Sequence, residues 1–409
     1  MRILVVGQVF YPDHFRINDV VKELAKDHQV KMVTGLPDYD LGKVPKEFRL
    51  FRRRRENFHG AEVIRVPIIS RRKGPVFRSL NYISYALMGS FYTFFLREKY
   101  DVVFSFQTSP ITMFLPGLVY AKKNKVRSVL YTLDLWPESV KAMSIREGTF
   151  FFDLVHRMSS RIYKGADKVL VSSPSFMEYL KEKIGLSFDR MDYLPQYTDE
   201  IAEGEELLNS EEKDQKSVDV RLEKLRTFTF AGNIGFVQDL ETIVEAASKI
   251  KGKPFQIHIV GSGSNEGAIR NLVRKKKVEE HFIFHGRKDQ EEMDDIYKCT
   301  DVCLLTLRND DFIGRTIPGK LQTYMAKGKA IAGAISYDSM DIIKESGAGY
   351  CVESGDALGL SQIMVKYIND ADLVRSCGRR AFEYYENHFR KENFIQSLLK
   401  HLKGEEKNV

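Results

Sequence analysis

The sequence predicts an α/β protein built from two doubly wound, Rossmann-like parallel-sheet domains. Its 409 residues, 43% hydrophobic and 29% charged, suffice for two ordinary globular domains. Short apolar runs alternate with helical patterns, as expected when crossover helices join buried parallel strands. A polar interval separates two such series. We expect domains at residues 1–196 and 225–380, a linker at 197–224, and a helical tail at 381–409 that packs back toward the first domain.

The first domain contains six apolar runs of the length expected for buried strands. They are Ile3–Gly7, Gln29–Thr34, Val63–Pro67, Val102–Phe106, Ser128–Thr132 and Lys168–Ser172. Helical patterns separate most of them. In one, Asn18–Lys26, four apolar residues form a single face, which predicts a helix packed on the sheet.

Five further runs predict the sheet of the second domain. They are Thr227–Ala231, Phe255–Val260, His281–His285, Val302–Thr306 and Ala330–Ala334. The tail from Asp372 to Leu402 is predicted to be helical. Its buried stripe would consist of Phe382, Tyr385, Phe389, Phe394 and Leu398. Ligands of doubly wound sheets bind beyond the carboxyl ends of the strands, so we expect chemistry on those loops, facing a cleft between the two domains.

Positive charge is concentrated in the first half of the chain. The net charge is +7 overall, and residues 1–200 carry 32 Lys and Arg against 22 Asp and Glu. Residues 41–80 alone carry 12 basic and three acidic residues. Such a cluster suits phosphate, nucleic acid or an anionic membrane, and charge alone does not choose among them. A nucleic-acid partner is disfavoured because no recognition motif accompanies the cluster.

The four cysteines and the start of the chain bear on metal sites and location. Cys299, Cys303, Cys351 and Cys377 have neither CxxC nor Cys/His spacing, which disfavours a structural zinc or a disulfide framework. The opening apolar run ends at Gly7, too short for a secretory signal. We therefore expect a cytoplasmic protein without a bound metal.

Residues 79–96 are uncharged and lie between Arg78 and Arg97. Their length is borderline for a membrane span, but four polar residues interrupt them and they lie between two strands of one sheet. A core helix is one interpretation. A helix lying partly on a membrane beside the basic cluster is the interpretation we favour.

Glycines follow the first two strands of the second domain. Gly232-Asn233-Ile234-Gly235 precedes a helix that starts near Leu240, and Gly261-Ser262-Gly263 repeats the arrangement. Glycines at a strand-to-helix turn allow a phosphate to approach the backbone and the positive end of the helix dipole. A tight turn would select the same residues, so both interpretations stay open.

The stretch from Arg308 to Lys329 carries the strongest indication of an anion site. A helix begins at Pro318-Gly319-Lys320, where proline in the first turn loses no hydrogen bond. A lysine in the first turn opposes the helix dipole, and a bound anion would explain its position. Arg315 and Arg308 could join it, and the alternative is a set of solvated surface charges.

In the first domain, polar residues follow three predicted strands. His14, Arg16 and Asn18 follow the first, and Gln107 follows the fourth. Asp134-Leu135-Trp136-Pro137-Glu138-Ser139 follows the fifth and holds the only tryptophan. Its two carboxylates could act as acid and base or bind sugar hydroxyls, whereas a helix cap and a buried indole would need no ligand.

Together these motifs resemble the GT-B glycosyltransferases of glycosyltransferase family 4, in particular the bacterial L-fucosamine-transferase-like subgroup of capsule, O-antigen and exopolysaccharide assembly. The resemblance covers nearly the whole chain. It depends on Tyr11-Pro12 with Phe15–Asp19, Gln107–Pro110, Asp134–Ser139, Gly232–Gly235 with Gln238, and Ile317–Gln322 with Tyr324–Ala326.

The resemblance implies a retaining, metal-independent transfer of a sugar, perhaps an N-acetylated amino sugar, from a UDP-sugar to a polyprenyl-diphosphate-linked saccharide. The enzyme would be peripheral on the inner face of the cytoplasmic membrane. Asp134, Glu138 and Lys320 would be catalytic, with Lys320 and nearby amides stabilising the leaving diphosphate. The acceptor would contact His14, Arg16, Asn18, Gln107 and Trp136. The donor would contact Gly232, Asn233, Gly235, Gln238, Gly261, Gly263, Arg287, Arg315, Gly319 and Thr323.

Two alternatives stay open. Thr323 and Arg315 stand where many such relatives have acids, which motivates the alternative of a catalytically silent nucleotide-sugar-binding or assembly subunit. The intact phosphate-binding motifs and the intact Asp134–Ser139 run argue against it. A sugar-nucleotide epimerase would share the two-domain fold, but it would need no basic surface toward a membrane and would need several acids in its cleft.

Overall fold

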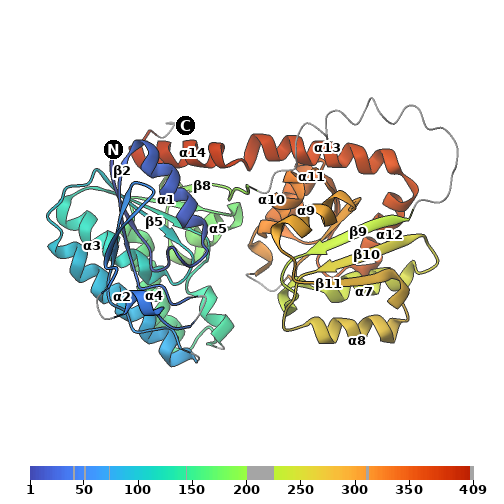
Figure 1. The fold of residues 1–409 in the computed structure, drawn as a ribbon, viewed down its shortest axis with the longest axis horizontal. Helices are drawn as coiled ribbons and strands as arrows, with labels where there is room; N and C mark the ends of the chain where they lie inside the picture. Colours follow the sequence, from blue (N-terminus) through green and yellow to red (C-terminus); the bar gives the residue numbers. More distant parts are fainter. Residues whose placement is uncertain are drawn as a thin grey trace. The chain divides into compact units, whose positions relative to one another are not determined.

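The computed structural model describes residues 1–39, 42–49, 52–72, 74–143, 145–199, 225–309 and 313–405. It divides into two compact units, residues 1–194 with 395–409 and residues 195–394 (Figure 1). Each unit has a sheet of mainly parallel strands joined by helices, so the predicted α/β class is confirmed. Most of the predicted linker, residues 200–224, lies outside the described residues.

The first unit contains an eight-stranded sheet in the order β3-β4-β2-β1-β5-β6-β7-β8. Every neighbouring pair is parallel except β3 and β4. The strands are β1 (Arg2–Val6), β2 (Gln29–Thr34), β3 (Arg55–Phe58), β4 (Ala61–Arg65), β5 (Val102–Gln107), β6 (Arg127–Thr132), β7 (Lys168–Val171) and β8 (Met191–Tyr193). The helices are α1 (Arg16–Asp27), α2 (Pro75–Phe95), α3 (Leu115–Asn124), α4 (Phe150–Gly165) and α5 (Pro174–Tyr179).

The second unit contains six parallel strands in the order β11-β10-β9-β12-β13-β14. The strands are β9 (Arg226–Ala231), β10 (Phe255–Val260), β11 (Phe282–Gly286), β12 (Val302–Thr306), β13 (Ala330–Ala334) and β14 (Gly349–Val352). The helices are α7 (Leu240–Lys249), α8 (Glu266–Lys276), α9 (Gln290–Lys298), α10 (Gly319–Ala326), α11 (Tyr337–Ser346), α12 (Ala357–Asn369) and α13 (Ala371–His388). The strand order reverses direction between β9 and β12, where doubly wound folds bind ligands.

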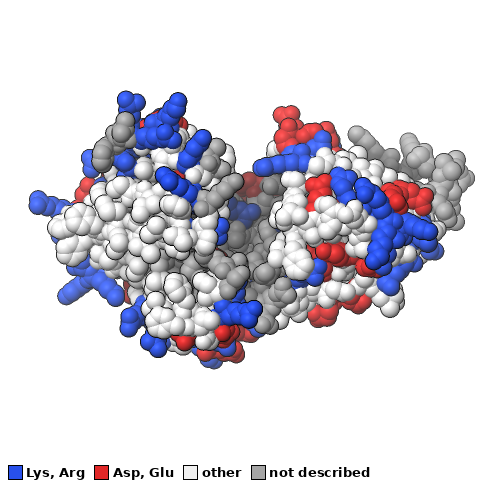
Figure 2. All heavy atoms as spheres, turned by 90° about the horizontal axis from the view of Figure 1, so that it is seen from below, with Lys and Arg blue, Asp and Glu red and all other residues white. Residues whose placement is uncertain are grey.

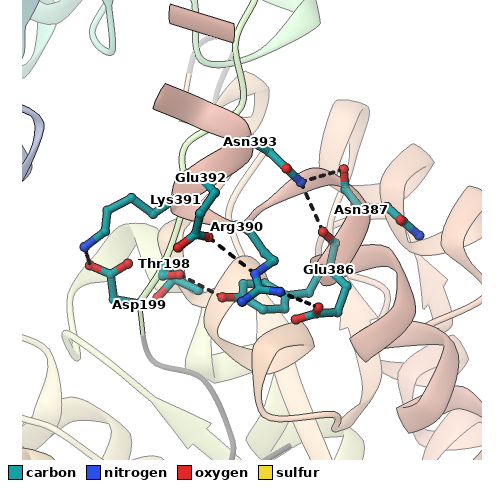
Figure 3. A network of polar contacts seen from close by, with 9 residues as sticks. Thr198, Asp199, Glu386, Asn387, Arg390, Lys391, Glu392 and Asn393 are labelled. Carbon is teal, nitrogen blue, oxygen red and sulfur yellow. Dashed lines mark hydrogen bonds and ion pairs between the residues drawn. The ribbon is translucent and has the colours of Figure 1, made fainter. Parts of the chain in front are cut away.

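The tail forms two helices rather than one. α13 ends at His388, and α14 (Lys391–Lys403) begins three residues later. At the break, the Asn393 Nδ2 donates to the carbonyl oxygens of Glu386 and Asn387, each at 3.0 Å (Figure 3). The Arg390 guanidinium pairs with Glu386 at 2.8 Å. The Asn393 side chain thus binds carbonyl groups that the backbone N–H groups of a continuous helix would have bound.

Thr198 and Asp199, which follow the last strand of the first sheet, contact the residues on either side of this break. The Tyr385 hydroxyl donates to the Thr198 carbonyl at 3.1 Å, and Lys391 pairs with Asp199 at 2.7 Å (Figure 3). The predicted buried stripe is confirmed for four of its five members. Tyr385, Phe389, Phe394 and Leu398 are buried, whereas Phe382 is partly exposed.

Three edge strands were missed by the sequence analysis, namely β3, β8 and β14. β3 is charged and half-exposed because it pairs on one side only, so it lacks the apolar run of a central strand. The predicted Val63–Pro67 strand lies two residues earlier, as β4. Pro67 has no backbone N–H to donate to a neighbouring strand, and Gly60 turns the chain between β3 and β4.

Candidate functional site

In the second unit, the two glycine loops pack backbone against backbone. The Gly232 N–H donates to the Val260 carbonyl at 2.9 Å, and the Ile234 N–H to the Ser262 carbonyl at 3.0 Å. A Cβ on Gly261 would lie 1.9 Å from the Gly232 oxygen, and one on Gly263 would lie 2.2 Å from the Ile234 oxygen. Gly261 and Gly263 are therefore required by the chain's own packing, whatever the loops bind.

Gly232 differs because it faces a lysine. Its φ is +146°, in the region that favours glycine, and it is exposed. A Cβ there would lie 3.4 Å from Lys320 Nζ. Gly235 has less room, since its Cβ would lie 2.7 Å from Asn233 Nδ2. The loop after β9 therefore presents bare backbone, with the exposed Asn233, beside the lysine.

Lys320 lies in the first turn of α10, directly after Gly319. Its Nζ donates to Oε1 of Gln238 and lies 3.8 Å from the centre of the Phe230 ring. Burial lowers the pKa of Lys320 to about 7. The residue as a whole is partly exposed. Lys320, Gln238 and Gly232 thus form one contact group, and the anion site at Lys320 stays a prediction.

The remaining predicted donor residues lie on other segments of the second unit and within α10. Arg287 is exposed after β11, and the Arg315 guanidinium lies 5.0 Å from the centre of the Tyr337 ring. Thr323 is buried within α10. Arg308 is already neutralised, because its guanidinium lies within 3.5 Å of Asp239 and 3.1 Å of Glu241. The two carboxylates therefore compensate the positive charge of Arg308.

In the first unit, the loops after β5 and β6 are joined by hydrogen bonds. Gln107 Nε2 donates to the Asp134 carbonyl at 2.9 Å, and Trp136 Nε1 donates to Ser109 Oγ at 3.2 Å. The Ser139 hydroxyl donates to the Asp134 carboxylate. Burial raises the pKa of Asp134, and the hydrogen bond from Ser139 opposes that rise. Gln107, Asp134 and Trp136 are thus brought together at the carboxyl edge of the sheet.

Glu138 is held differently from Asp134. It is buried, its Oε1 accepts from the Tyr179 hydroxyl at 2.8 Å, and its Oε2 pairs with Lys141 at 2.5 Å. Both carboxylate oxygens therefore have partners in the chain. The Glu138 carboxylate raises the pKa of Tyr179 beyond what burial alone does, so the phenol stays protonated as a donor.

The loop after β1 is organised by Asn18. Its Oδ1 accepts from the Tyr11 N–H at 2.9 Å, and its Nδ2 donates to the Asp13 carbonyl at 2.9 Å. Asn18 thus shapes the loop. His14 is exposed and Arg16 is partly exposed, so both side chains can reach a ligand.

The sequence analysis missed a buried polar chain that joins β1, β2 and α2. Gln8 Nε2 donates to Asn81 Oδ1 at 2.6 Å, and Asn81 Nδ2 donates to Asp38 Oδ2 at 3.0 Å. Burial raises the pKa of Asp38 to about 6. Tyr82, next on α2, places its ring 6.5 Å from that of Trp136. The signal was a single asparagine inside the apolar 79–96 run, which the sequence analysis treated only as an interruption.

Both units match family models. Residues 14–196 match the glycosyl transferase 4-like domain, and residues 211–384 match the glycosyl transferases group 1. Together the two matches cover most of the chain. The chain therefore belongs to the group 1 glycosyltransferases and has the GT-B fold.

Two relatives agree with this assignment, one of them over nearly the full length. The chain is 22% identical to WcaI of Escherichia coli (strain K12), named for glycosyl transfer in colanic acid biosynthesis, over 99% of this chain and 100% of that one. It is 28% identical to WbjE of Pseudomonas aeruginosa, named a glycosyltransferase, over 64% and 65% of the two chains.

Solved structures show the same fold. Sucrose-phosphate synthase from Thermosynechococcus elongatus matches with a TM-score of 0.71 at 16% identity, over 98% of each chain. HepE from Anabaena, solved with UDP, matches with a TM-score of 0.69 at 12% identity, over 99% of this chain and 100% of that one. Among the described helices, none has both the length and the apolar character needed to cross a membrane.

Proposed function

We propose that this glycosyltransferase transfers a sugar from a UDP-sugar to a lipid-linked saccharide during synthesis of a bacterial surface polysaccharide. The observation that carries the donor side is the buried ammonium of Lys320 beside the bare backbone of Gly232. UDP in the HepE structure and colanic acid in the name of WcaI support the donor class and the pathway class.

Lys320 has the properties required to stabilise a leaving diphosphate. An apolar ring and an uncharged amide surround its ammonium, so no carboxylate competes with an incoming phosphate in the contacts that fix it. Electrostatic attraction is strong where water is excluded. We therefore propose that Lys320 and amides near Gly232–Gly235 offset the developing charge without a metal, and that the anomeric configuration is retained.

On the acceptor side, we propose that Asp134 contacts the sugar hydroxyl that attacks the donor. Asp134 lies two residues after the end of β6 and has a raised pKa, so it is well suited to accept a proton. Gln107 and Trp136 would position the acceptor sugar through an amide and an aromatic face. His14 and Arg16, near the start of α1, are further candidates for contacts with the acceptor.

A membrane surface for the lipid-linked acceptor is proposed on the first unit. α2 exposes a row of apolar residues, and the start of α4 adds Phe150 and Phe151, which are 82% and 59% exposed. Figure 1 places α2 and α4 along the lower side of this unit, and Figure 2 shows that side with a broad uncharged area and Lys and Arg at its edges. Large exposed apolar patches beside basic residues are typical of membrane-binding surfaces.

The proposal is tested by incubating the purified protein with UDP-sugars and a polyprenyl-diphosphate-linked sugar. We expect release of UDP that depends on the acceptor, that persists in EDTA, and that yields a product with the donor's anomeric configuration by NMR. Binding of UDP without turnover across the donor panel would favour the silent subunit. Conversion of the UDP-sugar without an acceptor would favour the epimerase.

The membrane part has a separate test in liposome sedimentation. Replacing Phe150 and Phe151 by Ser should reduce binding to anionic liposomes while leaving UDP affinity unchanged. Binding should fall, without vanishing, between low and high salt, because salt screens the basic residues but not apolar burial. Equal sedimentation of the wild type and the double variant would contradict this surface.

A further inference from the structure

The first unit contains a pocket at the β3–β4 edge of its sheet. Its volume is about 640 Å³. The end of β4 and the C-terminal half of α2 form its walls. None of the residues assigned above to donor or acceptor binding lines it.

One wall of the pocket is apolar and the other is basic. Met88, Phe91 and Phe95 of α2 form the apolar wall, and Arg54, Arg55 and Arg97 contribute guanidinium groups. Phe91 and Phe95 are 62% and 61% exposed, and their ring centres lie 4.9 Å apart. The aromatic wall therefore extends from the pocket to the surface of the unit.

The basic wall retains charge for a ligand. Glu98 is the acid in the lining, and it already pairs with Lys31 and accepts from the Tyr100 hydroxyl at 2.5 Å. Arg55 lies 3.5 Å from Glu62, a loose pair between exposed side chains. Arg97 is exposed and forms no ion pair with any residue that the structure describes. The pocket is thus cationic on one side.

We propose that this pocket binds one anionic phospholipid of the bilayer. The arginines would hold its phosphate through charge-assisted hydrogen bonds, and an acyl chain would lie along Phe91 and Phe95. Beside the Tyr92 phenol, the α2 side chains that line the pocket are apolar and offer little to the several hydroxyls of a sugar phosphate or a nucleotide, so an amphiphilic anion fits best. This inference rests on the proposed attachment to a membrane. It adds a binding site for a single lipid to the membrane surface proposed above on α2 and α4.

The test uses dihexanoyl-phosphatidylglycerol below its micellar concentration, titrated into the full chain by calorimetry. We expect saturable binding of one molecule per chain, with weaker binding of dihexanoyl-phosphatidylcholine and of inorganic phosphate. UDP binding is measured in the same samples. Intact UDP binding without lipid binding would overturn the pocket and leave the proposed transferase unaffected.

Matched variants separate the pocket from the general surface. Phe91→Ser and Arg97→Gln should each weaken phosphatidylglycerol binding at least about tenfold, because each removes a lining group. Leu87→Ser and Lys99→Gln should change it less than about twofold, since both residues are exposed nearby but do not line the pocket. Circular dichroism and thermal unfolding check that all four fold.

Equal losses in the matched pairs would show a nonspecific basic and apolar surface and overturn the proposal. Inorganic phosphate binding as tightly as the lipid would show a simple anion site and would also overturn it. Unsaturable binding of both lipids would overturn the proposal as well. The apolar wall would then fit a surface for a protein partner.

Discussion

Replacing Lys320 by Met should raise the free energy of unfolding of the ligand-free protein and lower its kcat/KM for the donor. The unfolded chain binds this proton up to pH 10.5, whereas the folded protein binds it only below about pH 7. The wild type therefore gains stability as pH rises from about 7 to 10.5, and the cost of the buried ammonium is greatest below pH 7. Methionine keeps most of the packing and removes the charge.

The size of the stability effect follows from the pKa. A shift of 3.5 pH units, from 10.5 to about 7, corresponds to at most about 5 kcal/mol. Gln238 and the Phe230 ring stabilise the charged form and offset part of this cost. We expect Lys320→Met to raise the free energy of unfolding by about 2 to 4 kcal/mol at pH 7, and the gain to vanish near pH 10.5.

Donor use should change in the opposite direction. Loss of one charge-assisted contact to the diphosphate should cost about 2 to 4 kcal/mol in the transition state, or roughly 30- to 1,000-fold in kcat/KM. In the wild type, UDP affinity should also fall as pH rises above about 7, because the neutral amine cannot pair with phosphate, and binding should take up a proton.

Lys329 provides the control. Burial also lowers its pKa, and it lies beyond the C-terminal end of α10. Urea unfolding at pH 7 and 9.5, with UDP titration calorimetry, measures both effects. Lys329→Met should leave UDP affinity unchanged. If Lys320→Met is well folded and binds and turns over donor like the wild type, Lys320 is an ordinary buried lysine and the phosphate role is refuted.

Three further predictions concern other parts of the chain. Gly261→Ala should lower the free energy of unfolding by more than about 3 kcal/mol, because the new Cβ would overlap the Gly232 carbonyl, whereas Gly267→Ala, with open space, should raise it by about 0.5 to 1 kcal/mol. Burial lowers the pKa values of His258 and His285, and repulsion from His285 lowers that of His258 further. The free energy of unfolding should therefore fall as pH drops below 6.5. His285→Gln should reduce that loss, as measured by urea titrations at pH 7.5 and pH 5. Glu138→Gln should lower the free energy of unfolding by about 1 to 3 kcal/mol, whereas Asp134→Asn should mainly lower kcat; similar kinetic losses without destabilisation in both would contradict the assigned roles.

Central strands were predictable because burial on both faces leaves a continuous apolar run. β2, β10, β12 and β13 coincide with their predicted ranges. The edge strand β3 could not be found in this way, since its sequence, Arg-Glu-Asn-Phe, pairs on one side only. The break after His388 also escaped prediction, because it depends on Asn393 reaching back to carbonyls in the preceding helix.

The lysine of the donor site was predictable, but its neighbours were not. Its position after Pro-Gly at a helix start is a local pattern. The Phe230 ring under Nζ lies 90 residues away, on a strand where a phenylalanine reads only as core. The chain from Gln8 through Asn81 to Asp38 likewise joins three elements distant in sequence. Contacts between residues so far apart in the sequence cannot be predicted from local spacing.

The structure distinguishes the two carboxylates of the Asp134–Ser139 segment, of which the sequence already favoured Asp134 for its place next to the strand. Glu138 uses both oxygens within the chain, one on Tyr179 and one on Lys141, so a substrate proton would have to break an existing ion pair. The Asp134 carboxylate accepts from the Ser139 hydroxyl and also interacts with the side chains of Ser109 and Trp136, and burial raises its pKa. A carboxylate with a raised pKa and no ion pair among these contacts is the better base. We therefore propose the acceptor role for Asp134, and for Glu138 a positioning role in the segment after Trp136.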